Sequence, residues 1–405
     1  MSDDGKAVTN PERIALLQQH LKENELDALI CALPAHVLMM TGYWPVVGKS
    51  IAVVTTEGEV AILAPEDEEE LTAVGWATAI ETYPPNSLER LTTPVESAAE
   101  GLRRLARKLK VHCARIGYEF GPASEPASYA AMNIFGCSMV NLLRTAAPSA
   151  ALAPADDILQ RLTTTKTPLE IARIRRSCSI AQSAFAKGRE HLRAGMDEQQ
   201  IAVLFRAGLS TGSIASSGVQ RADGFAYCMS GPNSAKAFGA YARSRYRHLE
   251  PGDFVLLHCN SYADGYWTDI TRTYVLGKPD ERQQVLYEAV MQAHAAALRE
   301  VRSGAKTADV DHAAREVLRQ RGLADAFKHS TGHGVGFAAI SANAHPRLHP
   351  SSQETLAAGM VFNIEPAVYI DGYGGIRHCD MVAITDAGTE ILTPFHASLP
   401  ELTIH

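Results

Sequence analysis

Apolar residues in the first half of the chain fall into two alternating patterns. A helix is predicted over residues 11–26 and another over residues 98–110, because their apolar residues recur at steps of three and four. Short apolar runs of strand type lie between them, at residues 28–33, 50–56 and 59–64. Strands that alternate with helices indicate an α/β domain. The Ala- and Pro-rich stretch at residues 145–157 is interpreted as the linker that ends this domain.

The second half opens with a well-marked helix start. Thr167 can cap the helix, Pro168 suits its first position, and Glu170 completes a capping box. Helical spacing continues in three later segments, at residues 197–209, 280–301 and 308–322. Because 405 residues exceed one ordinary core, we predict two domains, residues 1–155 and residues 156–405.

Two predicted strand pairs in this half contain polar residues in apolar surroundings. Residues 252–273 read as two strands joined by a turn at Ala263 and Asp264. Folding the segment about this turn places His258 opposite Asp269. Two side chains that can bind a metal ion would then face each other across a hairpin.

The start of this strand pair is repeated later in the chain. Residues 249–258 align without gaps with residues 356–365, and the two segments end in His258 and Glu365. Folded as a hairpin, the second copy places Glu365 opposite Cys379. A match of ten residues can also arise by chance or from features common to many strands. Taken as real, it predicts two related hairpins that each present a facing pair of polar side chains.

These polar side chains require partners. A carboxylate buried without a partner is costly, so Asp269 and Glu365 should meet a metal ion, a substrate or other polar groups. His333 is a further candidate, because the glycines of "TGHGVG" let the backbone approach a site closely. Simpler interpretations exist: a core histidine, a small buried cysteine, a flexible turn, or an ion pair of Asp269 with Arg272 or Arg377. The functional hypothesis therefore rests on the joint arrangement.

Composition and charge narrow the class of protein. Hydrophobic residues make up 46% of the chain and charged residues 20%, which is typical of a globular protein in water. With a net charge of −7 and no block of Lys and Arg, we expect no nucleic-acid partner. The apolar runs are too short for a membrane span, and the first ten residues lack the apolar core of a signal peptide. The seven cysteines are odd in number and scattered, so we expect a cytoplasmic protein with reduced thiols.

Four ordered motifs carry a family resemblance that covers essentially the whole chain. The segments "GYWTDITRTYVLG", "TGHGVG", "GMVFNIEPAVYI" and "GIRHCDMVAIT" resemble the successive signatures of the pita-bread family. This family contains aminopeptidase P, prolidase, methionine aminopeptidase and creatinase. The resemblance implies a creatinase-like α/β N-terminal domain, an α+β pita-bread catalytic domain, and a hydrolase of C–N bonds.

The resemblance assigns five positions to metal ligands. In the peptidase members, two metal ions are held by Asp, Asp, His, Glu and Glu. Three of these positions fall on Asp269, His333 and Glu365. The other two depart, because His258 stands at the first Asp position and Cys379 at the last Glu position. An imidazole cannot bridge two ions as a carboxylate does, and this set lacks the negative charge for two divalent ions. We expect no metal or one divalent ion, with Zn²⁺ or Fe²⁺ favoured over Mn²⁺ by the nitrogen and sulfur donors.

Creatinase is the family precedent for hydrolysis without a metal ion. The leading hypothesis is therefore a creatinase-like hydrolase of a C–N bond in a small amidine, amide or amino-acid-derived substrate. The expected catalytic residues are His258, His333 and Glu365: a histidine would activate water, and Glu365 with Asp269 would orient a cationic group. One alternative is a metal-dependent Xaa-Pro aminopeptidase or dipeptidase with an atypical site. Another is a binding homologue without catalysis.

Further substrate-binding residues are expected at Tyr241, His345 and Arg377. Tyr241 stands where the family has an upstream histidine, and a second family histidine falls near Asn343 or His345. The expected partner is a small molecule or a short peptide.

The resemblance also implies a homodimer. Tyr43 and Trp44 lie in a segment similar to the one that reaches the active site of a partner subunit in the family. An aromatic pair in the core of the N-terminal domain is the alternative interpretation of these two residues.

Overall fold

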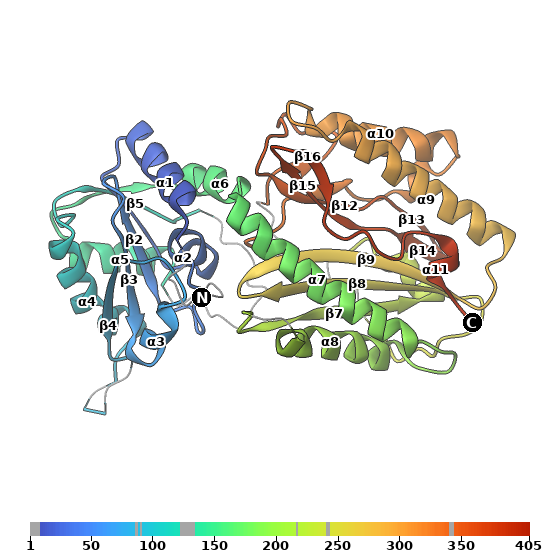
Figure 1. The fold of residues 1–405 in the computed structure, drawn as a ribbon, viewed down its shortest axis with the longest axis horizontal. Helices are drawn as coiled ribbons and strands as arrows, with labels where there is room; N and C mark the ends of the chain where they lie inside the picture. Colours follow the sequence, from blue (N-terminus) through green and yellow to red (C-terminus); the bar gives the residue numbers. More distant parts are fainter. Residues whose placement is uncertain are drawn as a thin grey trace. The chain divides into compact units, whose positions relative to one another are not determined.

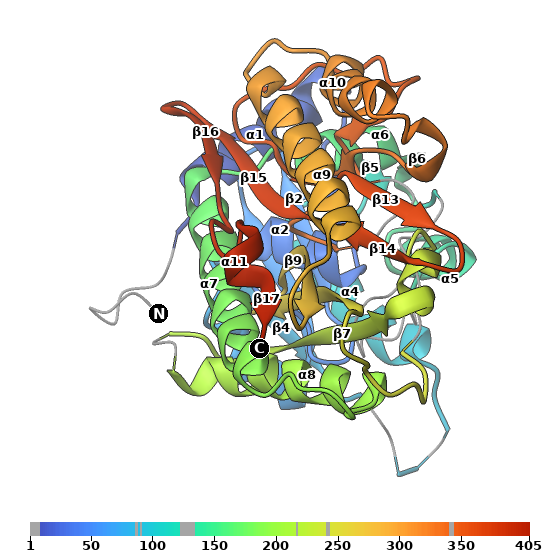
Figure 2. The same cartoon turned by 90° about the vertical axis from the view of Figure 1, so that its right-hand side faces the viewer.

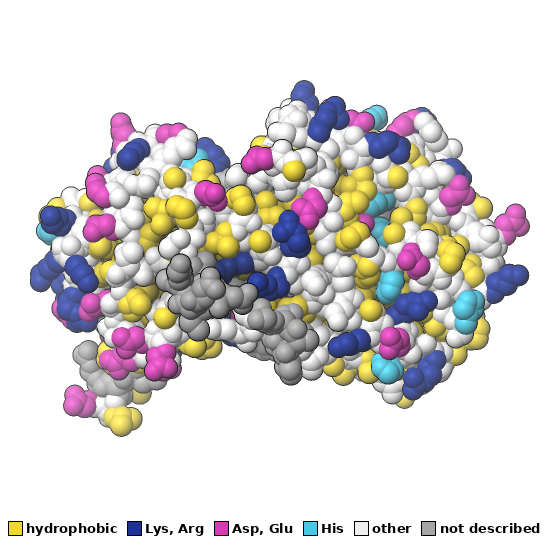
Figure 3. Space-filling model, viewed as in Figure 1, with side chains coloured by type: hydrophobic (Ala, Val, Ile, Leu, Met, Phe, Trp, Pro, Cys, Tyr) yellow, Lys and Arg dark blue, Asp and Glu magenta, His cyan; other side chains and the backbone are white. Residues whose placement is uncertain are grey.

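The chain folds into two compact units, of which the first ends at Thr163 and the second begins at Thr164 (Figures 1 and 2). The computed structural model describes residues 9–85, 88–89, 91–121, 134–215, 218–239, 244–339 and 344–405. Among these residues, no helix has the length and apolar character that crossing a membrane requires. On the face shown in Figure 3, positive and negative side chains are interspersed.

The first unit is built on a six-stranded mixed sheet with the strand order β4-β3-β2-β1-β5-β6. Its strands are β1 (Ala28–Cys31), β2 (Ile51–Thr55), β3 (Val60–Pro65), β4 (Ala79–Tyr83), β5 (Arg115–Tyr118) and β6 (Ala151–Pro154). Its helices are α1 (Pro11–Glu23), α2 (Pro34–Thr41), η1 (Glu66–Glu68), α3 (Glu69–Thr72), α4 (Pro94–Lys108), α5 (Cys137–Ala146) and α6 (Asp156–Thr164). Apolar residues of the central strands pack against α4 and α5 in one core. The predicted α/β domain is confirmed.

The interpretation of residues 145–157 as a linker is wrong. The end of α5, the strand β6 and the start of α6 fall within this stretch, and β6 pairs in parallel with β5 so that Ala151 lies opposite Arg115. Proline did not prevent this pairing, because β6 lies at the edge of the sheet and needs hydrogen bonds on one side only.

The second unit begins with α7 (Pro168–Glu190) and α8 (Glu198–Ala215), which pack on a mixed four-stranded sheet (Figure 1). This sheet has the order β17-β9-β8-β7. Its strands are β7 (Ala222–Ser230), β8 (Phe254–Ala263), β9 (Tyr266–Leu276) and β17 (Thr403–Ile404). The predicted capping box is present at the start of α7, where the side chains and backbone amides of Thr167 and Glu170 bond reciprocally.

The rest of this unit is a set of short strands packed against α9 (Glu281–Glu300). β12 pairs with β15 and β15 with β16, while β13 pairs with β14 and β10 with β11. The bounds are β10 (Gly332–His333), β11 (Arg347–Leu348), β12 (Val361–Ile364), β13 (Ala367–Ile370), β14 (Gly374–Arg377), β15 (Asp380–Thr385) and β16 (Gly388–Ile391). The remaining helices are η2 (Gly231–Lys236), α10 (Thr307–Gln320), η3 (Ala324–Ala326) and α11 (Leu399–Leu402).

The register predicted for the β8–β9 hairpin is wrong by two residues. His258 lies opposite Thr271, and Asp269 lies opposite Asn260. The turn is made by Asp264 and Gly265, which have φ values of 49° and 84°. An Asp-Gly pair suits a tight turn that needs positive φ at both central positions. A shift by two keeps each side chain on its face of the strand, so His258 and Asp269 still share a face.

The second hairpin has the predicted register. Ile364 lies opposite Asp380 and Ala367 lies opposite Arg377, which places Glu365 level with Cys379. The two hairpins meet where Cys379 N donates to the Thr271 carbonyl oxygen at 3.1 Å. Backbone pairing thus brings both predicted pairs of polar side chains to one place.

Candidate active site

The two hairpins and β10 bring six polar side chains together at one buried place, which we call the catalytic cluster. Its members are His258, Asp269, His333, Glu365, Arg377 and Cys379, of which His333 lies on β10. The donor atoms of Asp269, Glu365 and Cys379 all lie within 4.8 Å of one another. His333 Nε2 is 3.5 Å from Asp269 Oδ2 and 3.9 Å from Glu365 Oε1. Five of these residues are the positions that the resemblance assigned to ligands, and the fold brings all five together.

Backbone contacts hold His333 in place. Its N–H donates to Asn363 Oδ1 at 2.7 Å, and Asn363 Nδ2 is 3.3 Å from His333 Nε2. The glycines beside it allow this approach: a Cβ at Gly332 would lie 2.0 Å from the Asn363 carbonyl oxygen, and one at Gly334 would lie 1.9 Å from the His345 carbonyl oxygen. The expectation that these glycines permit close backbone contacts is confirmed.

Cys379 is a thiol rather than a thiolate in the chain without a ligand. Burial, with the negative charge of Asp269, raises its pKa well above the ordinary value. Its Sγ–H donates to the Asp269 carbonyl oxygen at 3.3 Å, and Sγ lies 3.8 Å from Asp269 Oδ1. In this form Cys379 adds no negative charge to the cluster.

Arg377 supplies a buried positive charge. Its Nε lies 3.8 Å from Glu365 Oε2 and donates to Thr271 Oγ1 at 3.0 Å. Its side chain is 8% exposed. The expectation of an ion pair between Asp269 and Arg272 is wrong, because Arg272 projects to the opposite face of β9 and pairs with Asp380 at 2.6 Å.

Burial and neighbouring charges separate the protonation states of the two carboxylates. Burial raises the pKa of Glu365 to about 7, with Arg377 opposing this and Asp269 adding to it. Burial also acts to raise the pKa of Asp269. In the acid range where this carboxyl titrates, however, His258 and His333 are both protonated, and their charges outweigh burial and lower the pKa. Asp269 therefore carries the fixed negative charge, and Glu365 exchanges its proton near neutral pH.

The two histidines of the cluster are shifted in opposite directions. Burial, followed by the charge of Arg377, lowers the pKa of His258 to about 4, so its ring is neutral. Burial also opposes charge on His333, but the hydrogen bond and charge of Asp269 raise its pKa to about 9. Arg377 and protonated His333 thus balance Asp269 and an ionised Glu365.

One pair of residues that the sequence analysis missed lies next to the cluster. His329 Nδ1 donates to the Ser330 carbonyl oxygen at 2.8 Å, so its Nε2 accepts from the Tyr369 hydroxyl at 2.9 Å. Tyr369 lies on β13, four residues after Glu365. Burial raises the pKa of Tyr369 to about 12, and the positive charge of Arg377 opposes this rise. The signal in the sequence was a second histidine four residues before His333, in "HSTGH".

The other expected substrate residues are not part of the cluster as described. Tyr241 and Asn343 lie outside the described residues. His345 Nδ1 is bound to Glu354 Oε1 at 2.8 Å, an interaction that fixes the loop. Tyr43 is 2% exposed and donates to Glu68 Oε2, and Trp44 is 8% exposed, which fits the alternative of an aromatic pair in the core.

A second buried group lies behind the first, and we call it the Asp380 cluster: Arg272, His294, His378 and Asp380. Asp380 Oδ1 accepts from Arg272 Nη2 at 2.6 Å and from the Thr393 hydroxyl at 2.7 Å. Its Oδ2 lies 3.2 Å from His378 Nε2 and 3.3 Å from His294 Nε2. Arg272 already neutralises this carboxylate, so a divalent ion here would add two positive charges to a buried guanidinium.

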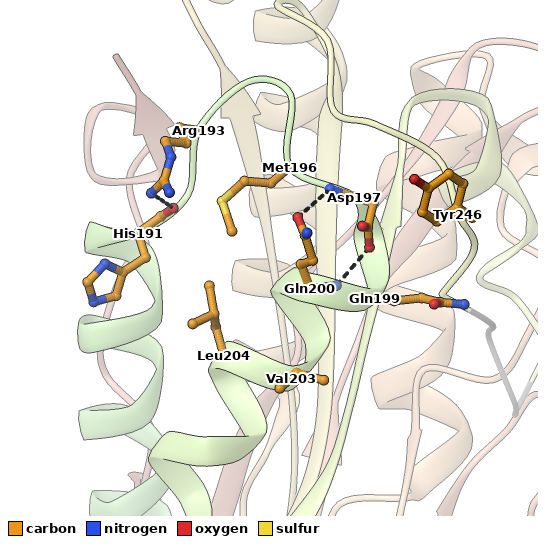
Figure 4. A pocket seen from close by; sticks show the side chains of 9 residues that line it. All are labelled: His191, Arg193, Met196, Asp197, Gln199, Gln200, Val203, Leu204 and Tyr246. Atoms are coloured by element: carbon orange, nitrogen blue, oxygen red, sulfur yellow. Dashed lines mark hydrogen bonds between the residues drawn. The ribbon is translucent and has the colours of Figure 1, made fainter.

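A pocket of about 630 Å³ lies away from both clusters, between the end of α7 and the first turns of α8 (Figure 4). None of the residues that line it belongs to the catalytic cluster: His191, Arg193, Met196, Asp197, Gln199, Gln200, Val203, Leu204 and Tyr246. Two of these residues bond reciprocally at the start of the helix (Figure 4): Asp197 N donates to Gln200 Oε1 at 3.2 Å, and Gln200 N donates to Asp197 Oδ1 at 2.8 Å.

Comparison with known proteins agrees with this arrangement. Residues 172–386 match metallopeptidase family M24, and residues 13–162 match the creatinase/prolidase N-terminal domain. The chain belongs to the M24 family. It is therefore a member of a family of hydrolases that act on C–N bonds, and the predicted creatinase-like and pita-bread domains are confirmed.

Individual relatives cover nearly the whole chain. An Xaa-Pro dipeptidase from Pyrococcus furiosus is 29% identical over 383 residues, which are 94% of this chain and 97% of the relative. The crystal structure of the prolidase from Pyrococcus horikoshii has a TM-score of 0.75 at 25% identity, covering 96% of this chain and 99% of that one. The N-terminal domain of the FACT complex subunit SPT16 from chickpea shares the fold with a TM-score of 0.69 at 14% identity, covering 97% and 98%.

The M24 family typically binds divalent metal ions, and the donor set here fits one ion. The donor atoms of Asp269, Glu365 and Cys379 lie within 4.8 Å of one another, and His333 Nε2 lies 3.5 Å from Asp269 Oδ2. Two carboxylates, a thiol and an imidazole are donor types that one tetrahedral ion takes. The set does not fit two ions, because His258 and Cys379 stand at positions where the family has bridging or charged carboxylates, and His258 Nδ1 already faces the Thr271 hydroxyl at 3.1 Å.

Proposed function

We propose that this chain hydrolyses the amide bond of a dipeptide-sized substrate at the catalytic cluster, with at most one divalent ion. The observation that carries the proposal is the unequal carboxylate pair, a fixed anion at Asp269 beside a titratable Glu365. The Xaa-Pro dipeptidase relative along 94% of the chain supports a dipeptide carrying proline on the amine side of the bond.

In this mechanism Glu365 moves the proton. As a carboxylate it takes a proton from the attacking water, whose oxygen bonds to the carbonyl carbon. The same proton then passes to the amine nitrogen as the C–N bond breaks, leaving a carboxylic acid and an amine. A pKa near 7 suits a group that must accept and return a proton.

The other cluster residues hold charge. Asp269 keeps His333 and Arg377 close, and these two cations favour the negative charge that develops on the carbonyl oxygen. When bound, a divalent ion on Asp269, His333, Glu365 and Cys379 would supply Lewis-acid polarisation of that carbonyl. The nitrogen and sulfur donors favour Zn²⁺ or Fe²⁺ over Mn²⁺.

The test combines elemental analysis with kinetics. The purified chain, prepared without added metal, is expected to contain no more than one tightly bound ion and to hydrolyse Ala-Pro. Glu365→Gln should abolish turnover, whereas Glu390→Gln, which alters an exposed carboxylate paired with Arg175, should leave it unchanged. Two stoichiometric ions, or full turnover in Glu365→Gln, would overturn the proposal.

A metal-free, creatinase-like hydrolysis of a small amidine or amide is the second candidate. It is favoured by the cations of the cluster itself, since Arg377 and protonated His333 balance the two carboxylates without an ion. Turnover of a small amide that survives prolonged chelation, with no turnover of Ala-Pro, would select this candidate over the first.

We also propose that the chain works as a homodimer, as the family resemblance implies. Light scattering should then give twice the 43.7 kDa of one chain. A monomer that stays active on dilution would contradict this.

A further inference from the structure

A buried amide group lies beside the catalytic cluster without a partner for its nitrogen. Asn260 is 3% exposed and stands directly opposite Asp269 in the β8–β9 ladder. Because it lies two residues after His258 on the same strand, its side chain projects from the same face as His258. Among the described residues, nothing hydrogen bonds to Asn260 Nδ2.

The amide of Asn260 lies beside the His258 ring. Both residues are on β8 and project from the same face of the strand. The Asn260 NH₂ group is enclosed, and within the part of the chain that the structure describes no acceptor takes up its Nδ2. The amide therefore offers this face of the site a donor that the folded chain leaves unused.

The ring is itself held from two sides. Arg377 Nε donates to Thr271 Oγ1 at 3.0 Å, and this hydroxyl lies 3.1 Å from His258 Nδ1. Since its oxygen accepts from Arg377, the hydroxyl can direct its proton to Nδ1, which leaves the ring proton on Nε2. The Tyr227 ring stacks on His258 with an interplanar angle of 14°. Hydrogen bonds and stacking thus fix the ring against which the Asn260 amide packs.

We propose that Asn260 is a substrate-binding residue whose NH₂ group donates to the carbonyl oxygen of the substrate amide, with His258 and Thr271 as its positioning residues. This inference rests on the proposed function. A buried donor without a partner is unfavourable, and it is explained where a ligand supplies the acceptor. A donor fixed in advance also stabilises the charge that develops on that oxygen. His258 then has a role that needs neither a metal ion nor a change of protonation.

Two substitutions at Asn260 test the donor itself. Asn260→Asp keeps the size of the side chain and replaces the NH₂ group by an oxygen, and Asn260→Ala removes the amide without adding charge. Each should lower kcat for Ala-Pro by about 100-fold, the usual cost of removing one oxyanion donor, and change KM less. The matched control is Ser261→Ala, the next residue, which faces the other way and bonds to Thr268 at 2.7 Å. An unchanged kcat in both Asn260 variants, with only a lower Tm, would reduce Asn260 to a structural residue.

Thr271 tests the positioning. Thr271→Val removes the hydroxyl at nearly constant volume and should lower kcat by about 10-fold, as an unheld donor loses preorganisation. Thr271→Ser restores the hydroxyl and should restore kcat. If Thr271→Ser is as poor as Thr271→Val, the methyl group rather than the hydrogen bond matters, and the positioning role is wrong.

A binding measurement separates this inference from the proposed function. The NH₂ signals of Asn260 in protein labelled with ¹⁵N at asparagine are assigned by their loss in Asn260→Ala. Acetamide, which offers a carbonyl oxygen, is expected to shift them, and a shift without turnover of Ala-Pro would reject the proposed function while supporting Asn260 as a binding residue. A shift with acetate and none with acetamide would overturn the carbonyl assignment. No shift with either probe would overturn the site.

Discussion

Two buried groups of histidine, carboxylate and arginine lie back to back on the same strands and are paired to different degrees. In the Asp380 cluster, the carboxylate accepts from Arg272 at 2.6 Å and from Thr393 at 2.7 Å. In the catalytic cluster, the contacts of Glu365 with Arg377 and His333 are 3.8 and 3.9 Å. The first carboxylate is held by close hydrogen bonds, and the second is near its cations without being bound by them.

Strand geometry separates the two groups. Thr271 and Arg272 are neighbours on β9, and Cys379 and Asp380 are neighbours where β15 begins, so successive side chains project to opposite faces. The Arg272 charge lowers the pKa of Asp380 well below its ordinary value against the effect of burial, whereas burial raises that of Glu365. A fully paired carboxylate contributes to stability, and a loosely paired one remains free for proton transfer.

The largest expected effect comes from breaking the fully paired cluster. Asp380→Asn leaves Arg272 charged in a site where it is 0% exposed. Removing one partner of a buried ion pair costs about 3–5 kcal/mol, so the free energy of unfolding in urea should fall by that amount. The control is Glu390→Gln, whose exposed pair with Arg175 is worth about 0–1 kcal/mol. A loss below about 1 kcal/mol for Asp380→Asn would mean that both clusters tolerate an unpaired charge.

The matching change in the catalytic cluster should leave stability nearly unchanged and strongly reduce turnover. Glu365→Gln removes a carboxylate that burial disfavours, so stability should stay within about 1 kcal/mol of the parent. Turnover should fall by about 10²–10⁴-fold, because the proton acceptor is lost. Urea unfolding and kinetics on the same samples make the comparison. A large loss of stability would place Glu365 among the structural carboxylates.

The difference in the free energy of unfolding between Glu365→Gln and the parent should depend on pH. The pKa of Glu365 is about 7 in the folded chain, which is above its value in the unfolded chain. At a pH between these two pKa values, Glu365 is protonated in the folded chain and ionised in the unfolded chain. Its contribution to stability is therefore present at low pH and is lost as the pH rises through 7. In chelated protein, Glu365→Gln should gain about 1–2 kcal/mol relative to the parent between pH 5 and pH 8. A gap that narrows with rising pH would show that the pKa is lowered instead.

The last expected effect, which added metal should reverse, comes from restoring the family's ligands. His258→Asp with Cys379→Glu rebuilds five ligand positions around Asp269, His333 and Glu365. The apo variant should be less stable than the parent by about 1–3 kcal/mol, because four carboxylates then share one cavity, and Mn²⁺ should reverse this loss. Elemental analysis should show more bound metal than in the parent, and native turnover should fall. If the two single variants bind no Mn²⁺ and keep full turnover, His258 and Cys379 serve only to fill the core.

Local signals in the sequence were sufficient where one residue determines the backbone. Thr167 and Glu170 predicted the start of α7 correctly, because both residues of the capping box are in place. The ligand positions came from motifs, since Asp269 and His333 stand in segments with specific neighbours. The same kind of local signal misled at residues 145–157, where proline at a sheet edge read as a linker.

Contacts across strands lay beyond what the sequence indicates. Register depends on which two residues make the turn, and choosing Ala263 and Asp264 instead of Asp264 and Gly265 moved every partner by two positions. Asn260 looked like an unremarkable polar strand residue, because its importance depends on facing Asp269 across the ladder. The pairing of Arg272 with Asp380 likewise follows from where β9 meets β15.

The repeated strand start has a consequence for how such a site can change. Gly252 and Gly359 have φ values of 91° and 86° before β8 and β12, so one backbone bend is used twice to aim a side chain at the cavity. The side chain delivered by each bend, His258 or Glu365, takes no part in the backbone ladder that holds its strand. Either hairpin can therefore receive a new functional side chain while the other hairpin and the backbone keep their shape. The chemistry of the site can thus change by substitutions in one hairpin alone.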